Sequence, residues 1–212
     1  MNSEDGDQSG DVLAQLDVSR ETSERLTTFA GLLREWSPRI NLVSRASLAH
    51  LWTRHILDSA QLLAHAPQDA AHWLDIGTGG GFPGMVCAIL GAESHPSLRF
   101  TLVESDRRKC TFLRTVARET GVDPEIEAAR IEALSPQAAD IVSARAVAPL
   151  ATLFRHAHPH LREDALLLFL KGARHENEID EARASWRFTV DARASITEPS
   201  ARVLICRDLS PL

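Results

Sequence analysis

Residues 71–84, with the sequence AHWLDIGTGGGFPG, have the composition of a nucleotide-binding loop. An apolar segment ends in Asp75 and Ile76, and it is followed by Gly77, Gly79, Gly80, Gly81 and Gly84. Backbone approaches a ligand closely only where no Cβ intervenes, and glycines allow this. Residues 85–90 are apolar and suit a helix, whose first N–H groups would be free to bind a ligand. The order of strand, glycine turn and helix therefore predicts a nucleotide site.

Two binding motifs overlap in this loop. The pattern GxGxxG from Gly79, with Glu104 twenty residues after its end, is typical of a dinucleotide site, whereas DxGxGxG from Asp75 is typical of S-adenosylmethionine (SAM) methyltransferases. A carboxylate just before the glycines would repel a pyrophosphate and attract the sulfonium and ammonium groups of SAM. We therefore predict that SAM is the cofactor, with an NAD-dependent oxidoreductase as the alternative. The predicted contacts are Asp75, Gly77, Gly79 and Gly81.

The elements that would position this loop alternate along most of the chain. Apolar segments predict strands at 72–76, 99–104, 125–129, 139–143 and 165–170, and helices at 84–91, 107–119, 149–157 and 175–185. Residues 186–190 and 201–206 predict two more strands, joined by a turn at Glu198-Pro199. We expect an α/β fold with a mostly parallel seven-stranded sheet and an antiparallel C-terminal hairpin. Ligands of such sheets bind beyond the carboxyl ends of the strands.

The first third of the chain has a helical pattern. Residues 20–36 predict an amphipathic helix that Ser37-Pro38 ends, and Ser47 can cap a second helical region that extends to Ala64. We therefore divide the chain into a flexible acidic leader (1–18), an N-terminal helical cap (19–67) and a SAM-binding methyltransferase domain (68–212).

Composition limits the class of protein. The net charge of −6 owes much to Glu4, Asp5, Asp7 and Asp11 of the leader, which lacks the basic start and apolar run of a secretion signal. No stretch reaches the roughly 18 apolar residues of a membrane span. The three cysteines form no CxxC pair and no metal spacing. We expect a cytoplasmic, monomeric protein that binds neither a membrane nor a metal.

Further segments occur in a characteristic order: INLVSR (40–45), RHILDS (54–59), LDIGTGGGFPG (74–84), LVESDRRKCTFLR (102–114), ARIEAL (129–134), SARAVAPL (143–150) and LFLKG (168–172). Across about residues 20–206, the chain resembles the bacterial 16S ribosomal RNA (rRNA) small subunit methyltransferase G family, also called glucose-inhibited division protein B. The resemblance implies a class I SAM-dependent methyltransferase (Rossmann-like) fold. It also implies methyl transfer from SAM to N7 of one guanine in 16S rRNA, near the decoding region. The alternative is a SAM-dependent methyltransferase that acts on a small molecule or a protein.

The resemblance also implies which residues hold the cofactor. Glu104 matches the acid that ends the second strand and would accept hydrogen bonds from the ribose hydroxyls. Ile131 and Glu132 match the pair that faces the adenine. The family's cofactor contacts carry over to Gly77, Phe82, Glu104, Ile131, Glu132 and Arg145.

The residues around the loop fit methylation of a ring nitrogen. Guanine N7 carries a free lone pair and no proton, so the enzyme needs only to hold donor and acceptor in line. Ser143, Ala144 and Arg145 stand where enzymes that methylate exocyclic amines have an Asn/Asp-Pro-Pro-aromatic motif. Cys87, Cys110 and Cys206 fall in predicted helices and in a strand, as packing residues do. We expect no catalytic residue beyond positioning by Arg145 and Lys171.

RNA binding needs local positive charge even in an acidic protein. Residues 36–57 and 143–162 contain no acid, and several arginines and histidines lie in both windows. We expect both windows near the mouth of the site. The predicted RNA contacts are Arg39, Arg45, Arg54, His55 and Lys171, and the partner is 16S rRNA or the small-subunit particle. His55 and Asp58 lie on one helix face, but two ligands are too few for a metal.

Overall fold

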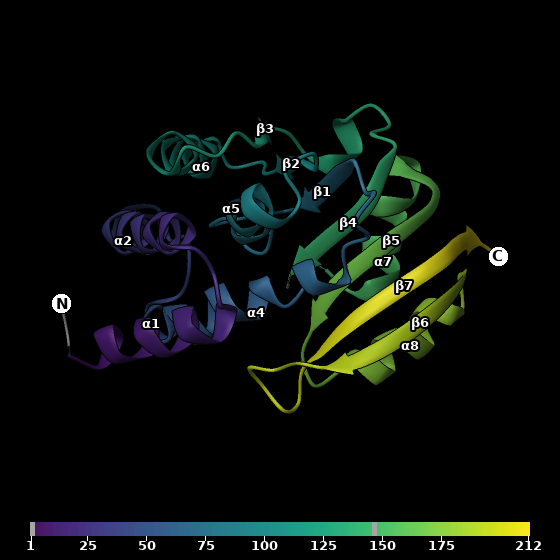
Figure 1. Cartoon of the computed structure of the whole chain (residues 1–212). Helices are drawn as coiled ribbons and strands as arrows, with labels where there is room; N and C mark the ends of the chain where they lie inside the picture. Colours follow the sequence, from purple (N-terminus) through teal and green to yellow (C-terminus); the bar gives the residue numbers. More distant parts are fainter. Residues whose placement is uncertain (1–2, 146–147) are drawn as a thin grey trace.

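The computed structural model describes residues 3–145 and 148–212. Seven strands form one sheet in the order β3-β2-β1-β4-β5-β7-β6 (Figure 1). The strands are β1 (His72–Ile76), β2 (Arg99–Val103), β3 (Glu125–Glu127), β4 (Ala139–Arg145), β5 (Leu161–Lys171), β6 (Trp186–Ala194) and β7 (Arg202–Pro211). Strands β1 to β5 pair in parallel, and β7 is antiparallel to both of its neighbours. This confirms the predicted mostly parallel sheet with an antiparallel C-terminal hairpin.

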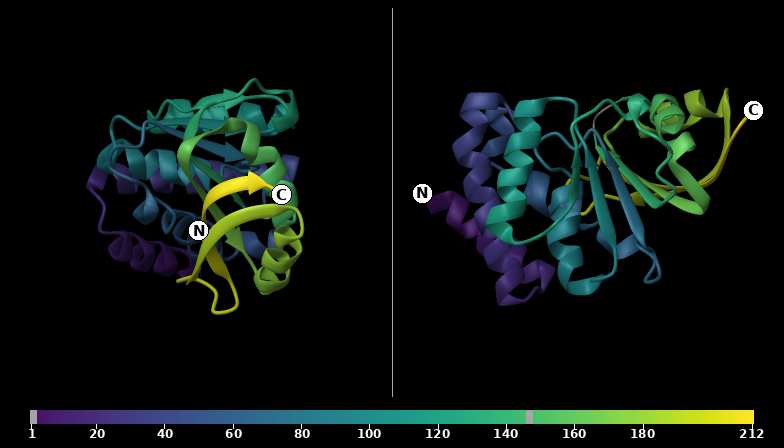
Figure 2. Two further views of the ribbon diagram at one scale, coloured as in Figure 1. Left: turned by 90° about the vertical axis from the view of Figure 1, so that its right-hand side faces the viewer. Right: turned by 90° about the horizontal axis from the view of Figure 1, so that it is seen from above.

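Helices cover both faces of the sheet (Figures 1 and 2). On one face, α5 (Gly84–Ser94) and α6 (Arg107–Thr120) lie against the sheet, and on the other lie α7 (Leu150–Ala157) and α8 (His175–Arg183). Neighbouring strand residues point to opposite sides of the sheet. Both faces are apolar because successive residues of the central strands are apolar. Trp73 packs with α5 on the first face, whereas Leu74 packs with α7 on the second. The crossover helices therefore bury both sides of the central strands, as parallel sheets require.

The N-terminal helices extend the α5–α6 layer. Helix α2 (Arg20–Ile40) packs against α5 and α6 through Phe29 and Leu33, both fully buried. Ser19 caps its N-terminus by accepting a hydrogen bond from the Thr22 N–H. The helix continues through Pro38 and ends at Asn41 in a left-handed conformation, so the predicted stop at Ser37-Pro38 is wrong. A proline φ is compatible with a helix, but proline also removes one backbone N–H; Pro38 does so in the last turn, and the last helical residue, Ile40, follows two residues later.

The acidic leader is folded for most of its length. Residues Ser3–Leu16 form helix α1, which corrects the expectation of a flexible segment. Val12 is 2% exposed, and Leu13 and Leu16 pack against the same apolar cluster. These three residues share one helix face, so burial of that face stabilises the helix despite the acids around it. The division of the chain at residue 67 stays a prediction, because α2 shares one continuous cluster with α5 and α6.

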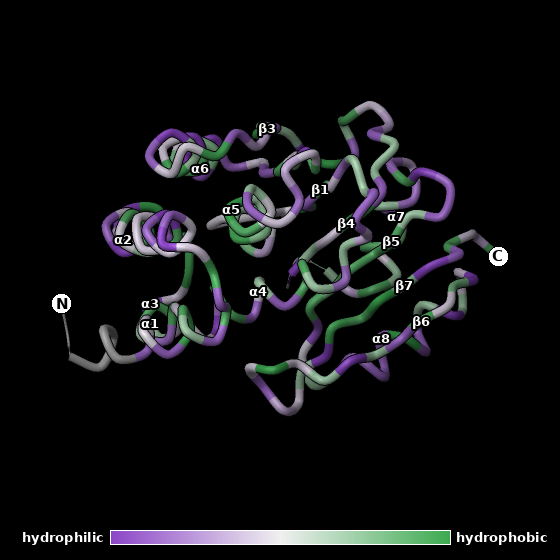
Figure 3. Tube along the Cα trace, viewed as in Figure 1, coloured by the Kyte–Doolittle hydropathy of each residue, from purple (hydrophilic) through white to green (hydrophobic). Residues whose placement is uncertain are grey.

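Short helical pieces connect α2 to the sheet. They are α3 (Arg45–Leu48), a π-helical turn η1 (Trp52–Leu57), α4 (Asp58–Ala60) and the 3-10 turn η2 (Leu63–His65). Two more 3-10 turns, η3 (Ile131–Ala133) and η4 (His158–His160), flank β4 and α7. Ser44, and not the predicted Ser47, caps the first of these pieces by accepting a hydrogen bond from Ser47 N–H. The hydropathy trace shows the apolar segments gathered in the sheet and on the inner helix faces (Figure 3). Within the described residues, none of the helices has the length and apolar character to cross a bilayer.

Candidate functional site

The glycine loop follows β1 at the carboxyl-end edge of the sheet. Gly77, Gly79 and Gly81 have φ values of 67°, 59° and 95°, a left-handed region that L side chains rarely adopt. A Cβ on Gly81 would lie 2.8 Å from the Cβ of Met85, and a Cβ on Gly84 would overlap Leu102 and Asp75. Glycine is therefore required at Gly81 both by backbone conformation and by close packing, and at Gly84 by packing.

Asp75 is buried under this loop and does not face a ligand. Its side chain is completely inaccessible, and the carboxylate accepts hydrogen bonds from Ser143 Oγ at 2.6 Å and from Gly84 N at 3.0 Å. The expectation that this carboxylate contacts the cofactor is therefore wrong. The physical reason is the pleat of β1, which points Asp75 toward the N-terminus of α5. Asp75 joins β1, β4 and α5 and thereby shapes the loop.

Burial raises the pKa of Asp75 to about 6, although the hydrogen bonds from Ser143 and Gly84 act in the opposite direction. The folded protein therefore binds this proton more tightly than the unfolded chain, and its contribution to stability falls as the pH rises from about 4 to 6. A shift of this size corresponds to about 3 kcal/mol.

Replacing Asp75 with asparagine should remove this pH dependence. We expect the free energy of unfolding of Asp75→Asn, relative to wild type, to improve by about 3 kcal/mol between pH 4 and pH 7. Urea denaturation of both proteins at the two pH values measures this difference. Subtracting the wild-type free energy of unfolding from that of the variant removes the contributions of the other titrating groups. A difference that is the same at both pH values would contradict the raised pKa of Asp75.

A cavity of about 230 Å³ lies beyond the carboxyl ends of β1, β2 and β3. Glu104 follows β2 and is 8% exposed; its carboxylate accepts hydrogen bonds from Gly79 N at 3.0 Å and Asp106 N at 2.7 Å. The loop and the acid thus hold one another in place at the edge of the cavity. The lining residues are Ile76, Gly77, Val103, Glu104, Ser105, Ala129, Arg130, Ile131, Glu132 and His156.

This cavity contains four of the predicted cofactor contacts: Gly77, Glu104, Ile131 and Glu132. Glu132 is exposed and lies 3.3 Å from His156 of α7. Phe82 does not line the cavity; it is 3% exposed, and its ring packs against Phe29 at 5.3 Å between centroids. Phe82 therefore joins the glycine loop to the N-terminal helices.

Arg145 ends β4 and links three parts of the structure. Its guanidinium donates hydrogen bonds to the Arg54 carbonyl at 3.1 Å and to His55 Nδ1 at 2.7 Å. It also lies 3.6 Å from Asp58 Oδ2 and 4.8 Å from the centre of the Phe82 ring. Arg145 therefore connects β4, the η1–α4 segment and the residue that follows the glycine loop.

The π-helical turn η1 sets the position of His55. Arginine can only donate, so His55 Nδ1 is the acceptor and the proton of the neutral ring lies on Nε2. Burial, together with the charges of Arg145 and Arg54, lowers the pKa of His55 to about 3. His55 therefore stays neutral at physiological pH, as expected for a side chain that packs 4.9 Å from the Phe82 ring.

A second cavity, of about 460 Å³, lies beyond β4 and β5 at the same edge of the sheet. It brings together Arg54, His55, Arg145 and Lys171, which are far apart in the sequence. Among its other lining residues, Ser47, Thr197 and Arg202 were not expected at the site. A local sequence signal for them is weak, because they come from three separate segments: α3, the β6–β7 connection and the start of β7.

Lys171 is buried, and its ammonium is bound by other groups of the protein. It is 6% exposed, and its ammonium donates to Ala148 O at 2.6 Å and to Glu178 Oε2 at 2.7 Å. The same Glu178 oxygen accepts a hydrogen bond from Leu150 N. The expectation that Lys171 contacts RNA phosphate is therefore not supported by its surroundings; its observed contacts fix the start of α7 against α8.

The other predicted cations lie apart from this cavity. Arg39 and Arg45 are exposed on α2 and α3, and Arg39 pairs with Glu35. Arg162 pairs with Asp140 at the starts of β5 and β4, so it lies at the opposite edge of the sheet. The expectation that the whole 143–162 window lies near the site is wrong, because α7 returns the chain to that edge. The SARAVAPL match includes Ala146 and Val147, which lie outside the described residues.

The three cysteines pack inside the protein. Cys87, Cys110 and Cys206 are all fully buried, as expected for packing thiols. Burial raises the pKa of each of them, to about 12 for Cys206. A thiol with a raised pKa is a poor nucleophile at neutral pH. The cysteines therefore do not supply the thiolate that cytosine C5 methylation requires.

Comparison with known proteins gives relatives over nearly the whole chain. The chain is 50% identical over 199 residues to a ribosomal RNA small subunit methyltransferase G from Cereibacter sphaeroides, covering 94% of this chain and 97% of that protein. It is 53% identical over 190 residues to the protein of that name from Ruegeria sp., covering 90% and 92%.

Solved structures share the fold at low sequence identity. A methyltransferase from Geobacter sulfurreducens matches with a TM-score of 0.58 at 15% identity, over 85% of this chain and 88% of that one. A putative SAM-dependent methyltransferase from Methanococcus maripaludis matches with a TM-score of 0.55 at 13% identity, over 83% and 90%. These matches confirm the class I SAM-dependent methyltransferase fold.

The family model described as GidB, rRNA small subunit methyltransferase G, matches residues 22–205. This range includes the glycine loop, both cavities and the connection between β6 and β7. On this match and on the two relatives above, the chain belongs to the GidB family of rRNA small subunit methyltransferases.

Proposed function

We propose that this protein transfers the methyl group of SAM to N7 of a guanine in 16S rRNA, near the decoding region. One observation supports this most directly: Gly77 of the glycine loop and Glu104 line one cavity, and Arg54 and Arg145 line another at the same sheet edge. Parallel sheets bind their ligands at this edge. The arrangement provides one place for a cofactor and another for its methyl acceptor, in a protein of a family of rRNA methyltransferases.

The first cavity fits SAM. Gly77 exposes backbone at its edge, and Glu104 has carboxylate lone pairs left after accepting two backbone N–H groups. In the proposed site these lone pairs accept hydrogen bonds from the ribose hydroxyls, and Ile131 packs against the adenine. Gly79 and Gly81 hold the loop in shape, and Glu132 borders the adenine side. SAM itself supplies an activated methyl group.

The chain's own residues then act by positioning. Guanine N7 has a free lone pair, so no proton has to be removed before attack, and the rate depends on the alignment of N7 with the methyl group. Arg145 holds the η1–α4 segment against the end of β4, which fixes the wall of the acceptor cavity. Arg54 is exposed there and can contact RNA phosphate, and the exposed Arg39 and Arg45, on α2 and α3 apart from this cavity, are further candidate contacts. In this proposal the protein is a monomer in the cytoplasm, and its substrate is 16S rRNA or the small-subunit particle.

The experiment that tests this function maps 7-methylguanosine in 16S rRNA from cells with and without the protein. A single guanine near the decoding region that loses its methyl group without the protein supports the proposal. Methylation of 16S rRNA that is unchanged, together with transfer from SAM to a small molecule or protein, would support the alternative acceptor instead.

Replacing Glu104 with glutamine should weaken SAM binding about 10- to 100-fold, because a hydrogen bond to a charged group contributes roughly 1.5–3 kcal/mol. Isothermal titration calorimetry with SAM measures the change. Glu119→Gln is the matched control, because Glu119 is an exposed acid on α6 that lies away from the cavity. Unchanged affinity in Glu104→Gln would argue against a ribose contact.

A further inference from the structure

The connection between β6 and β7, residues 195–201, is anchored to α4. Asp58 Oδ1 accepts hydrogen bonds from Thr197 Oγ1 at 2.8 Å and from Ser195 Oγ at 3.3 Å. Gln61 adds a third link, because its Oε1 accepts from Ile196 N and its Nε2 donates to Asp58 Oδ1. These links join segments more than 130 residues apart in the sequence. The connection is thus held at a defined place.

The same carboxylate faces Arg145. Asp58 Oδ2 lies 3.6 Å from the Arg145 guanidinium, and both side chains are 16% exposed. One carboxylate therefore uses one oxygen for the β6–β7 connection and the other for the arginine at the end of β4. A displacement of the connection would be transmitted to Asp58 and to the surroundings of Arg145.

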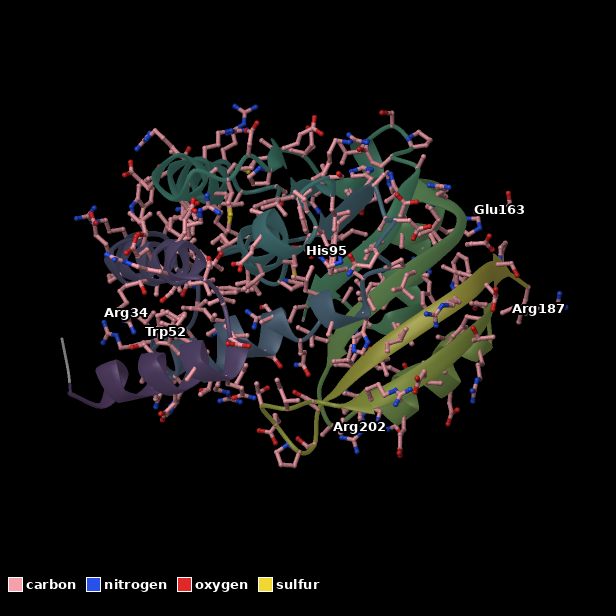
Figure 4. The ribbon with its side chains drawn as sticks, viewed as in Figure 1. Arg34, Trp52, His95, Glu163, Arg187 and Arg202 are labelled. Carbon is pink, nitrogen blue, oxygen red and sulfur yellow. The ribbon has the colours of Figure 1, made fainter. Side chains whose placement is uncertain are left out.

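The anchored connection forms one wall of the second cavity. Thr197, Glu198 and Ala201 line it, together with residues from η1 and β4. Arg202 begins β7 at the base of this wall, where Figure 4 labels it, and its guanidinium donates to Pro199 O at 2.7 Å and to Ala201 O at 2.8 Å. The wall is therefore fixed from both ends.

The connection also exposes an apolar side chain. Ile196 is 56% exposed, and within the described residues only Leu212 is a more exposed large hydrophobic residue. Leu212 lies at the C-terminus, at the other end of β7 (Figure 1). An exposed apolar residue next to a cavity with arginines suits an unstacked nucleotide, which offers a flat apolar face and a phosphate together.

We infer that the 195–201 connection is the wall that receives the RNA nucleotides around the target guanine, with Asp58 and Thr197 as its positioning residues and Ile196 as an RNA contact. This inference rests on the proposed function. The 195–201 connection lies outside the family's recognisable motifs. The inference gives it a role in RNA binding and no role in SAM binding.

The test measures KM and kcat for small-subunit rRNA, and the Kd for SAM, in Thr197→Val, Thr197→Ser, Ile196→Ser and Leu212→Ser. We expect Thr197→Val and Ile196→Ser each to raise KM for RNA about fivefold, with kcat and the SAM Kd unchanged. Thr197→Ser retains the hydroxyl and should restore the wild-type KM. Leu212→Ser is the matched control for loss of an exposed apolar residue and should leave KM unchanged.

Two results would overturn the inference. One is a wild-type KM for RNA in both Thr197→Val and Ile196→Ser; the other is a weaker SAM affinity in Thr197→Val, which would place the wall at the cofactor. Failure of the wild-type protein to methylate small-subunit rRNA would instead reject the proposed function, and the inference with it. Methylation by the wild type with unaffected variants rejects the inference alone.

Discussion

Replacing Arg145 with lysine is expected to lower the rate of rRNA methylation by about 100-fold, the cost of a misplacement of roughly 1 Å between reacting groups. Lysine keeps the positive charge, but its single ammonium cannot reproduce the planar guanidinium that reaches the Arg54 carbonyl, His55 and Asp58. The η1–α4 segment would then lose its fixed position against β4.

Methyl transfer from labelled SAM to small-subunit rRNA, at saturating concentrations of both, measures this effect. Arg155→Lys is the matched control, because Arg155 is an exposed arginine on α7 outside both cavities. Thermal unfolding of each variant separates loss of positioning from loss of structure. A wild-type rate in Arg145→Lys would mean that the charge alone is sufficient.

Replacing Gly81 with alanine is expected to destabilise the protein by about 3–5 kcal/mol and to abolish measurable SAM binding. Holding a non-glycine residue at such a φ costs roughly 1–3 kcal/mol, and forcing a methyl group into packed space costs a similar amount. At Gly81 both costs apply, since φ is 95° and the new Cβ would lie 2.8 Å from the Cβ of Met85. Relief of this contact requires the loop to move.

Gly79→Ala provides the matched control in the same loop. Gly79 also has a left-handed φ, of 59°, but a Cβ there would meet only the carbonyl oxygen of Gly77, at 3.8 Å. We therefore expect a smaller loss of stability, of about 1 kcal/mol, and retained SAM binding. Urea denaturation and calorimetry measure both quantities. Equal effects at Gly79 and Gly81 would show that conformation, and not packing, decides the loop's tolerance.

The fold could be predicted from the sequence because it depends on local patterns. Alternating apolar strands and amphipathic helices gave the parallel sheet, and strand β1 was predicted with the bounds His72–Ile76 that it has. The glycine loop was predicted from close approach of the backbone to a ligand, whereas the structure shows a different reason for glycine at Gly77, Gly79 and Gly81, their left-handed φ values. The leader was mispredicted because its acids obscured the spacing of Val12, Leu13 and Leu16, whose burial the structure reveals.

The direction of a side chain was harder to predict. Asp75 stands at the position where a ligand contact was expected, yet it points beneath the loop and accepts hydrogen bonds from Ser143 and Gly84. Lys171 was expected at an RNA surface, yet Glu178 binds its ammonium inside the protein. In both cases the partner lies on another element, so the contact depends on packing that the sequence does not show.

The sequence by itself determined the order of the elements, the glycine loop and the family, because these follow from local propensity and from motifs of contiguous residues. Only the tertiary structure decided which side chains meet. Arg145, Asp58 and Thr197 are separated by many tens of residues, and they are brought together by the pairing of β4 with β5, by the pairing of β5 with β7 and by the π-helical turn η1. Contacts of this kind result from the folding of the whole chain, since each partner is fixed by a different element.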